Sequence, residues 1–267
     1  MTEIQMPPPP AVAKLCDCVD KLIEAYSSGF ERGKIRLGRY ESEVEAYTLQ
    51  KLVVRQAEAT ILMARHDLVL LPSAHVTARS CFETHIRIKW MLHPIDPYER
   101  EIRWVSHLRT GAEQWGKFER NPIVGDFWRS KFGKQKQALD NFAQEISDLL
   151  SKDGYPNPEK LPNLWEMLKE LGQPELYMFY VWMSAFAHSN FEAATIYRKN
   201  LGCGKELGEF IDAKDWALPL EIVWKSLFES SRRILELVET PDDSFAAAPL
   251  AVEFQARLNE LLDYRSK

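Results

Sequence analysis

The sequence predicts an all-α protein, a single bundle of about eight helices around a central hydrophobic helix. Apolar residues recur at helical spacing through most of its 267 residues. No stretch shows the sustained alternation of apolar and polar residues, bounded by hairpin turns, that indicates strands. Segment 174–191 carries no charged residue between Glu175 and Glu192 apart from the titratable His188, and its apolar residues fall on every side of a helix. Such a pattern is typical of a helix surrounded by others, so we expect this segment at the centre.

The first half of the chain is divided by prolines and capping residues. Pro7–Pro10 cannot enter a helix interior, so residues 1–10 are expected to form a disordered leader, followed by one domain over residues 11–267. Ser42 and Glu45 have the spacing of a capping box. Pro72 suits the first turn of a helix, and Asp96 precedes a proline that begins another. The predicted helices span residues 11–32, 42–65, 72–92 and 97–119.

The second half is divided in the same way. The stretch 153–162, DGYPNPEKLP, is the clearest loop and a candidate subdomain boundary. Gly172 ends a short helix, and Pro174 opens the apolar one. Residues 200–208 contain three glycines and are expected to form a loop. The predicted helices span residues 121–152, 163–171, 174–191, 219–239 and 249–264.

Composition excludes several classes of protein. A net charge of -5 argues against a surface devoted entirely to nucleic acid, although local basic patches remain open. The four cysteines have no regular spacing, so we expect reduced thiols in the cytoplasm, without a disulfide framework, a metal site or a cofactor. The apolar segment is shorter than the roughly 20 residues that a membrane span needs, and the N-terminus has no signal-peptide pattern. We therefore expect no membrane partner.

A ladder of polar side chains lies on the predicted helix 72–92. His75, Arg79, Glu83 and Arg87 are spaced four apart and share one face. The plain interpretation is an ion pair between Arg79 and Glu83 within the helix. However, apolar neighbours indicate that the helix is largely buried, and buried charges are costly unless they are fully partnered. The ladder is therefore a candidate site.

A second ladder, Tyr180, Ser184 and His188, lies on the apolar segment. If the two ladders face each other, they form a pocket in which Arg79 holds a phosphate or carboxylate, Glu83 orients a base and His188 moves protons near Ser184. Tyr180, His75 and Arg87 are then ligand-binding candidates. The alternative is that the same residues form a structural network.

Two resemblances involve these residues. The pattern R-S-x-x-E followed by S-x-x-x-H-S resembles a bacterial all-helical family of unknown function, over roughly residues 42–197, whose members are associated with defence against phage. The pair Arg79 and His85, with five residues between them, is similar to the Arg–His motif of the HEPN ribonucleases, which act across a dimer interface. This resemblance implies a homo-oligomer. The motif allows four to six residues between the Arg and the His, and Arg87 with His93 and Arg100 with His107 also fit it, so the motif is not specific.

The stretch 117–136 combines basic and aromatic residues. Six Lys or Arg side chains stand against two acidic ones, interleaved with Phe118, Phe127, Trp128 and Phe132. Such a stretch can form a face for single-stranded RNA. An amphipathic helix with a solvated basic side is the simpler explanation and the one we favour.

Two functions follow from these patterns. The first is a metal-independent ribonuclease-like or other phosphodiesterase effector, with His188 or His85 as acid–base and Arg79 on the phosphate. The second is a non-catalytic sensor or interaction module that binds an anionic ligand or a partner protein. The expected partners are RNA or an anionic small molecule, together with a second copy of the chain.

Overall fold

The computed structural model describes residues 5–158, 160–199, 206–241, 245 and 247–264. Over these residues the protein is helical, apart from one antiparallel pair of two-residue strands, so the predicted all-α class is confirmed. The helices are α1 (Pro10–Glu31), α2 (Glu41–His66), α3 (Leu71–Met91), α4 (Pro97–Glu119), α5 (Asp126–Lys152), α6 (Leu164–Glu170), α7 (Tyr177–Ala187), α8 (Phe191–Ala194), α9 (Ala217–Leu237) and α10 (Ala247–Leu262). Short 3-10 turns are η1 (Leu68–Leu70), η2 (Pro174–Leu176), η3 (Thr195–Tyr197) and η4 (Ala213–Trp216), and the strands are β1 (Arg198–Lys199) and β2 (Glu206–Leu207).

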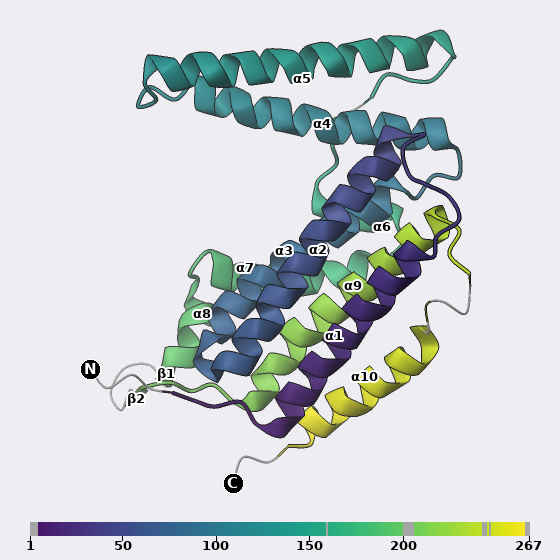
Figure 1. The fold of residues 1–267 in the computed structure, drawn as a ribbon. Coiled ribbons are helices and arrows are strands. Elements are labelled where there is room, and N and C mark those ends of the chain that lie inside the picture. The colour runs from purple at the N-terminus through teal and green to yellow at the C-terminus, as the bar shows by residue number, and fades with distance from the viewer. Residues whose placement is uncertain (1–4, 159, 200–205, 242–244, 246, 265–267) are drawn as a thin grey trace.

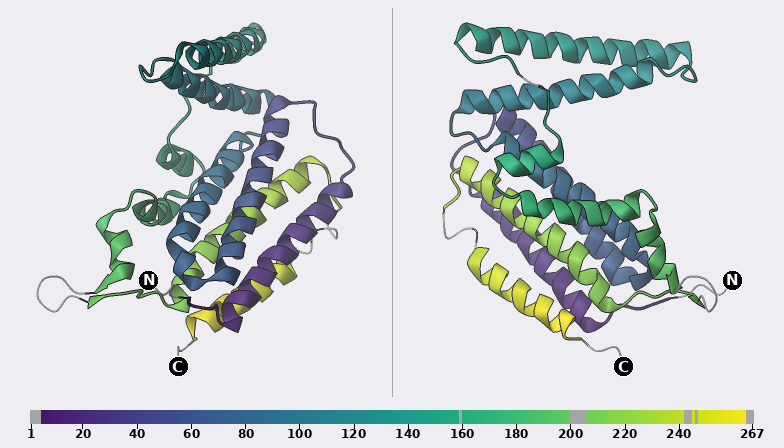
Figure 2. Two further views of the ribbon diagram at one scale, coloured as in Figure 1. Left: turned by 60° about the vertical axis from the view of Figure 1, so that its left-hand side comes forward. Right: turned by 180° about the vertical axis from the view of Figure 1, so that it is seen from behind.

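Four long helices, α1, α2, α3 and α9, lie side by side and form the body of the bundle (Figure 1). Each turns an apolar stripe inward, which is the arrangement that helical spacing of apolar residues predicts. Helix α10 packs on the outside of α1, and α6 and α7 pack on the outer side of α3 (Figure 2). The hydrophobic core therefore lies between α1, α2, α3 and α9.

The predicted central position of segment 174–191 is wrong. Its helix, α7, buries Met183 and Ala185, whereas Met178, Val181 and Trp182 are 67%, 51% and 55% exposed. The central position belongs instead to α3, which packs against α2, α9, α7 and α6. A lack of charge permits burial but does not require it, and α7 has only eleven residues, too few to run the length of the bundle.

Capping explains several helix boundaries. The Asp96 carboxylate accepts from the Tyr98 N–H at 2.9 Å and begins α4, as predicted. Gly172 follows α6 with φ of +70°, a conformation that favours glycine. The predicted Ser42 cap is wrong, because α2 begins at Glu41 and the Ser42 N–H donates instead to the Glu101 carboxylate of α4 at 2.8 Å.

Helices α4 and α5 form an antiparallel hairpin that extends beyond the end of the bundle (Figure 1). Its attached end is held by the Tyr155 hydroxyl, which donates to Asp96 at 2.8 Å, and by Arg109, which donates to the Pro158 carbonyl at 2.9 Å. Both contacts involve the loop predicted as a subdomain boundary. The boundary itself, like the single domain over residues 11–267, stays a prediction.

The predicted leader and the glycine loop are described only in part. Residues 1–4 and 200–205, which include Cys203, lie outside the described residues. The Met6 N–H donates to the Asp67 carboxylate at 3.0 Å, and the Met6 carbonyl accepts from the Leu68 N–H at the start of η1 at 2.9 Å. Within the described part of the chain, no helix combines the length and apolar character needed to cross a bilayer.

Candidate functional site

The two predicted ladders meet at the packing of α3 against α7. Arg79 of α3 lies 2.9 Å from the Glu83 carboxylate and donates a second hydrogen bond of 2.9 Å to the Tyr180 hydroxyl of α7. Its guanidinium carbon also lies 4.7 Å from the centre of the Tyr180 ring. Arg79 is therefore engaged by a carboxylate, a phenol and a ring face, and its charge is compensated within the protein.

One turn earlier on α3, His75 stacks on Phe186 of α7. The ring centres are 4.1 Å apart and the planes 10° apart. Burial lowers the pKa of His75 to about 4, so the imidazole is neutral near pH 7. The pairs Arg79 with Tyr180 and His75 with Phe186 show that the two helices run antiparallel.

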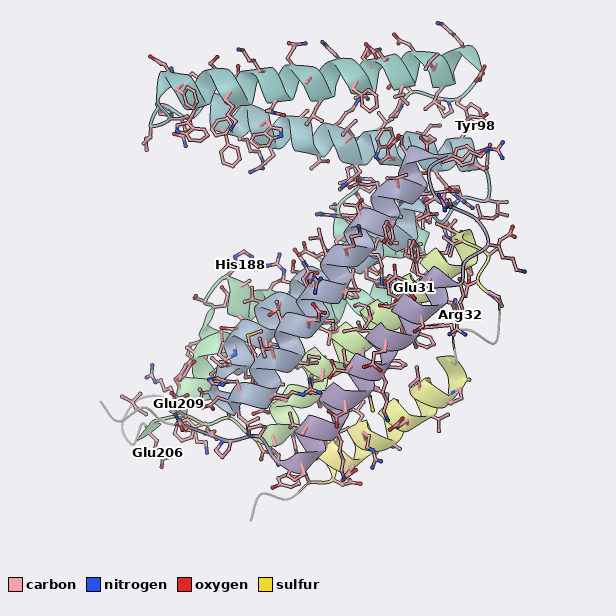
Figure 3. The ribbon with its side chains drawn as sticks, viewed as in Figure 1. Glu31, Arg32, Tyr98, His188, Glu206 and Glu209 are labelled. Carbon is pink, nitrogen blue, oxygen red and sulfur yellow. The ribbon has the colours of Figure 1, made fainter. Side chains whose placement is uncertain are left out.

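This direction separates His188 from Arg79. His188 caps the C-terminus of α7 with an exposed side chain, and its ring points outward (Figure 3). It lies two helical turns beyond Tyr180, about 12 Å at 1.5 Å per residue, toward the His75 end of α3. The Ser184 hydroxyl donates to the Tyr180 carbonyl of its own helix at 2.6 Å. The expected pocket of Arg79, Glu83, Ser184 and His188 is therefore not assembled.

His85 faces a different helix. It is buried against α9, where its Nε2 atom lies 3.6 Å from the Glu229 carboxylate, and Lys89 binds the same carboxylate at 2.5 Å. The neighbouring His85 and Lys89 side chains lower the pKa of Glu229 to about 2. Burial lowers the pKa of His85 itself. Since Arg79 faces α7, the Arg79–His85 pair lies on two faces of α3 and is not brought together within one chain.

The open space at this site lies beside Arg87, the last residue of the α3 ladder. A cavity of about 140 Å³ is lined by Glu83, Arg87 and Tyr180, together with residues 161–164 and Met167 at the start of α6. A wider hollow of about 620 Å³ shares Asn163, Leu164 and Tyr180 with it and adds Trp165 and Tyr177. The two spaces are neighbours between α3, α6 and α7, and we refer to them together as the groove.

Among the described residues, Arg87 is the charged side chain of this groove that has no partner. Its side chain is half-buried, and no described residue gives it a hydrogen bond or an ion pair. Glu83, which stands one turn away, is held by Arg79. The donors of Arg87 are therefore free to bind an anion that enters the cavity. The sequence pattern identified Arg87, Glu83 and Tyr180, but not Trp165 or the loop 161–164, whose approach to α3 depends on tertiary packing.

Comparison with known proteins places this region in a family. The model of the Family of unknown function (DUF5677) matches residues 47–205, more than half of the chain. The chain belongs to this family. The match agrees with the predicted resemblance to a helical family of unknown function over roughly residues 42–197. Neither the curated proteins nor the solved structures contain a match to the chain.

The DUF5677 match includes the groove and also the α4–α5 hairpin. At the free end of the hairpin, Trp115, Phe118 and Trp128 surround Phe132, with ring centres 5.3 to 5.9 Å away. Phe127 and Trp128 are 73% and 51% exposed, and Lys131 lies 5.0 Å over the Trp128 ring. The basic and aromatic residues predicted from the sequence thus gather at one tip. Helices α9 and α10 lie outside the match.

Proposed function

We propose that this protein is a non-catalytic helical binding module that holds a nucleotide-like anion in the groove between α3, α6 and α7. The observation that carries the proposal is Arg87, a half-buried guanidinium with no partner among the described residues. Guanidinium groups bind phosphate and carboxylate through paired N–H donors. Because Arg79 and Glu83 already neutralise each other, Arg87 leaves the groove with an excess positive charge.

The walls of the groove indicate a planar body attached to the anion. Trp165 packs edge-on against Tyr177 at 5.3 Å, and Tyr177 lies 5.4 Å from Tyr180. Trp165 is 41% exposed, so its ring is accessible to a ligand. A hollow of about 620 Å³ lies in the range that accepts small molecules. A purine or pyrimidine on these rings, with its phosphate on Arg87, satisfies both features.

The geometry supports binding better than metal-independent cleavage. General acid–base catalysis requires a proton-transfer group within hydrogen-bond reach of the reacting atom. His188 is exposed at the far end of α7, and His85 is buried against Glu229 on the opposite side of α3. Neither histidine stands beside Arg87 or Arg79 in this arrangement. Incubation of the pure protein with total RNA in chelator should therefore leave the RNA intact, and cleavage that is lost in His188→Ala or His85→Ala would contradict the proposal.

Calorimetric titration with adenosine 5′-monophosphate tests the groove directly. We expect binding of one molecule per chain, weakened about tenfold or more by Arg87→Gln, which removes the charged hydrogen bonds. Adenosine, which lacks the phosphate, should bind more weakly and show no dependence on Arg87. The matched control is Arg232→Gln on α9, an exposed arginine far from the groove in the sequence.

The outcomes of this titration separate the proposal from its alternatives. Unchanged affinity in Arg87→Gln, or no binding of the nucleotide by the unmodified protein, would overturn it. Trp165→Ala provides a second test. Loss of the exposed ring should weaken the binding of adenosine and of its monophosphate alike.

The hairpin tip supports a second candidate, binding of single-stranded RNA. The supporting observation is the exposed pair Phe127 and Trp128 beside an excess of basic side chains, including Lys131 and Lys134. Exposed rings stack bases and lysines contact phosphates, so affinity for an oligouridine should fall as the salt concentration rises.

Fluorescence anisotropy tests this second candidate and should show loss of oligouridine binding in Phe127→Ala/Trp128→Ala. Leu149→Ala, at an exposed position near the other end of α5, is the control. Equal affinity for the oligouridine in both variants would exclude the hairpin tip as the RNA-binding site.

A further inference from the structure

A second cavity lies at the other end of α7, away from Arg87. It has a volume of about 540 Å³ and opens between α7, the η3–β1 segment, the start of α9 and the end of α10. Its aromatic walls are Trp182 and Phe186 of α7 and Phe210, which follows β2. Residues of α9 and α10 contribute, so this cavity extends beyond the part of the chain matched by the family model. A cavity of this size and lining accepts a small aromatic molecule.

His75 lines this cavity without a polar partner. The residue is 3% exposed, and neither ring nitrogen forms a hydrogen bond to another residue in the described part of the chain. Stacking on Phe186 satisfies the ring face but not the ring nitrogens. A buried polar group left unpaired is unfavourable, so the imidazole adds an unused hydrogen-bonding group to an otherwise apolar wall.

The lysines are the charged groups of this cavity that remain available to a ligand. Its two carboxylates are engaged within the protein, because Asp215 accepts from the Asp212 N–H at 2.7 Å and Glu221 pairs with Lys225 at 2.5 Å. Its two lysines, Lys199 and Lys214, have no carboxylate partner among the residues that the structure describes. Lys199 lies 4.3 Å from the centre of the Phe210 ring, which places the cation at an aromatic wall. A ring with an attached negative charge complements both features.

We infer that this cavity is a second binding site, which takes an aromatic carboxylate with its ring between Trp182, Phe186 and Phe210 and its carboxylate toward Lys199 and Lys214. The site is separate from the groove of the proposed function and does not depend on Arg87. Aromatic faces supply the affinity for the ring, and the lysines select the charged form over its neutral analogue.

Calorimetric titration of the full chain with 2-naphthoate tests the inference. We expect one bound molecule per chain and a dissociation constant that rises about tenfold or more in Lys199→Gln/Lys214→Gln. The double variant Lys34→Gln/Lys152→Gln removes two exposed lysines elsewhere and should leave the dissociation constant unchanged. The neutral 2-naphthamide should bind more weakly and should not respond to either pair of substitutions. Arg87→Gln should also have no effect, which distinguishes this site from the groove.

Three results would overturn the inference. The first is the absence of naphthoate binding to the unmodified protein. The second is equal affinity in the Lys199→Gln/Lys214→Gln and control variants, which would show that the lysines do not hold the carboxylate. The third is unchanged affinity in Leu218→Trp, because Leu218 lines the cavity and a larger ring there fills it. Thermal unfolding of each variant by circular dichroism establishes that it is folded before the titration.

Discussion

Helices α3 and α7 pack against each other, and the burial of each is the opposite of what its composition suggests. α3 carries Arg79, Glu83, Arg87 and two histidines, yet it lies inside the bundle between four other helices. α7 contains no charged residue, yet it lies on the outside with Met178, Val181 and Trp182 exposed. The number of neighbours around a helix decides its burial, and a charged ladder is tolerated where each charge is partnered. Arg87, which has no partner among the residues that the structure describes, is the exception and lies in the groove.

The sharpest test of this comparison is truncation of an apolar side chain in each helix. Ile86→Ala in α3 removes a fully buried side chain and should lower the free energy of unfolding by about 2–5 kcal/mol, because a cavity remains. Val181→Ala in α7 removes a side chain that is 51% exposed and should change it by about 0.5 kcal/mol or less. Urea unfolding followed by circular dichroism measures both. Similar losses would show that α7 is buried after all.

The pH dependence of stability tests the burial of His75 on α3. Its pKa is lowered by burial from 6.5 to about 4, so the unfolded chain takes up a proton near pH 6.5 and the native chain does not. Stability is therefore complete above about pH 6.5 and falls as the pH drops toward 4, by about 3 kcal/mol from this group. His75→Phe should flatten the profile. Because burial also lowers the pKa of His85, part of the slope should remain.

A control variant makes the pH experiment decisive. His188→Gln removes an exposed histidine and should retain the profile of the unmodified protein. Urea unfolding at pH 7, 5.5 and 4 measures all three proteins. A profile that is the same in His75→Phe as in His188→Gln would mean that His75 is not held neutral.

The smallest expected effect comes from the hydrogen bond that joins the two helices. Tyr180→Phe removes the hydroxyl that accepts from Arg79 but keeps the ring beneath the guanidinium, and Glu83 still holds the charge. The free energy of unfolding should fall by about 1 kcal/mol. Tyr177→Phe is the matched control, since its hydroxyl has no partner among the described residues, and should change little. Equal values for the two variants would show that the contact adds nothing.

The sequence predicted most helix boundaries because their signals are local. Asp96 and Gly172 act on neighbouring backbone groups, and the structure uses both as predicted. The approach of Tyr180 to the Arg79 ladder was also predictable, since a half-buried guanidinium needs partners.

The rest of the site depends on how distant segments pack. Helix α7 ends early, at Ala187, and runs antiparallel to α3. His188 therefore lies away from Arg79. His85 meets Glu229, which lies 144 positions later in the sequence, and no spacing rule connects them. The same is true of Trp165, which closes the groove from α6.

The free end of the α4–α5 hairpin should unfold locally more easily than the helical bundle. Beyond His107, whose ring lies 3.3 Å from the Glu45 carboxylate of α2, α4 runs on to Glu119, about 18 Å at 1.5 Å per residue. Over that length each helix is buried only on the face turned toward the other. This end can therefore unfold locally, starting at the tip, while the bundle stays folded. Its backbone amides should exchange with deuterated water long before those of α3.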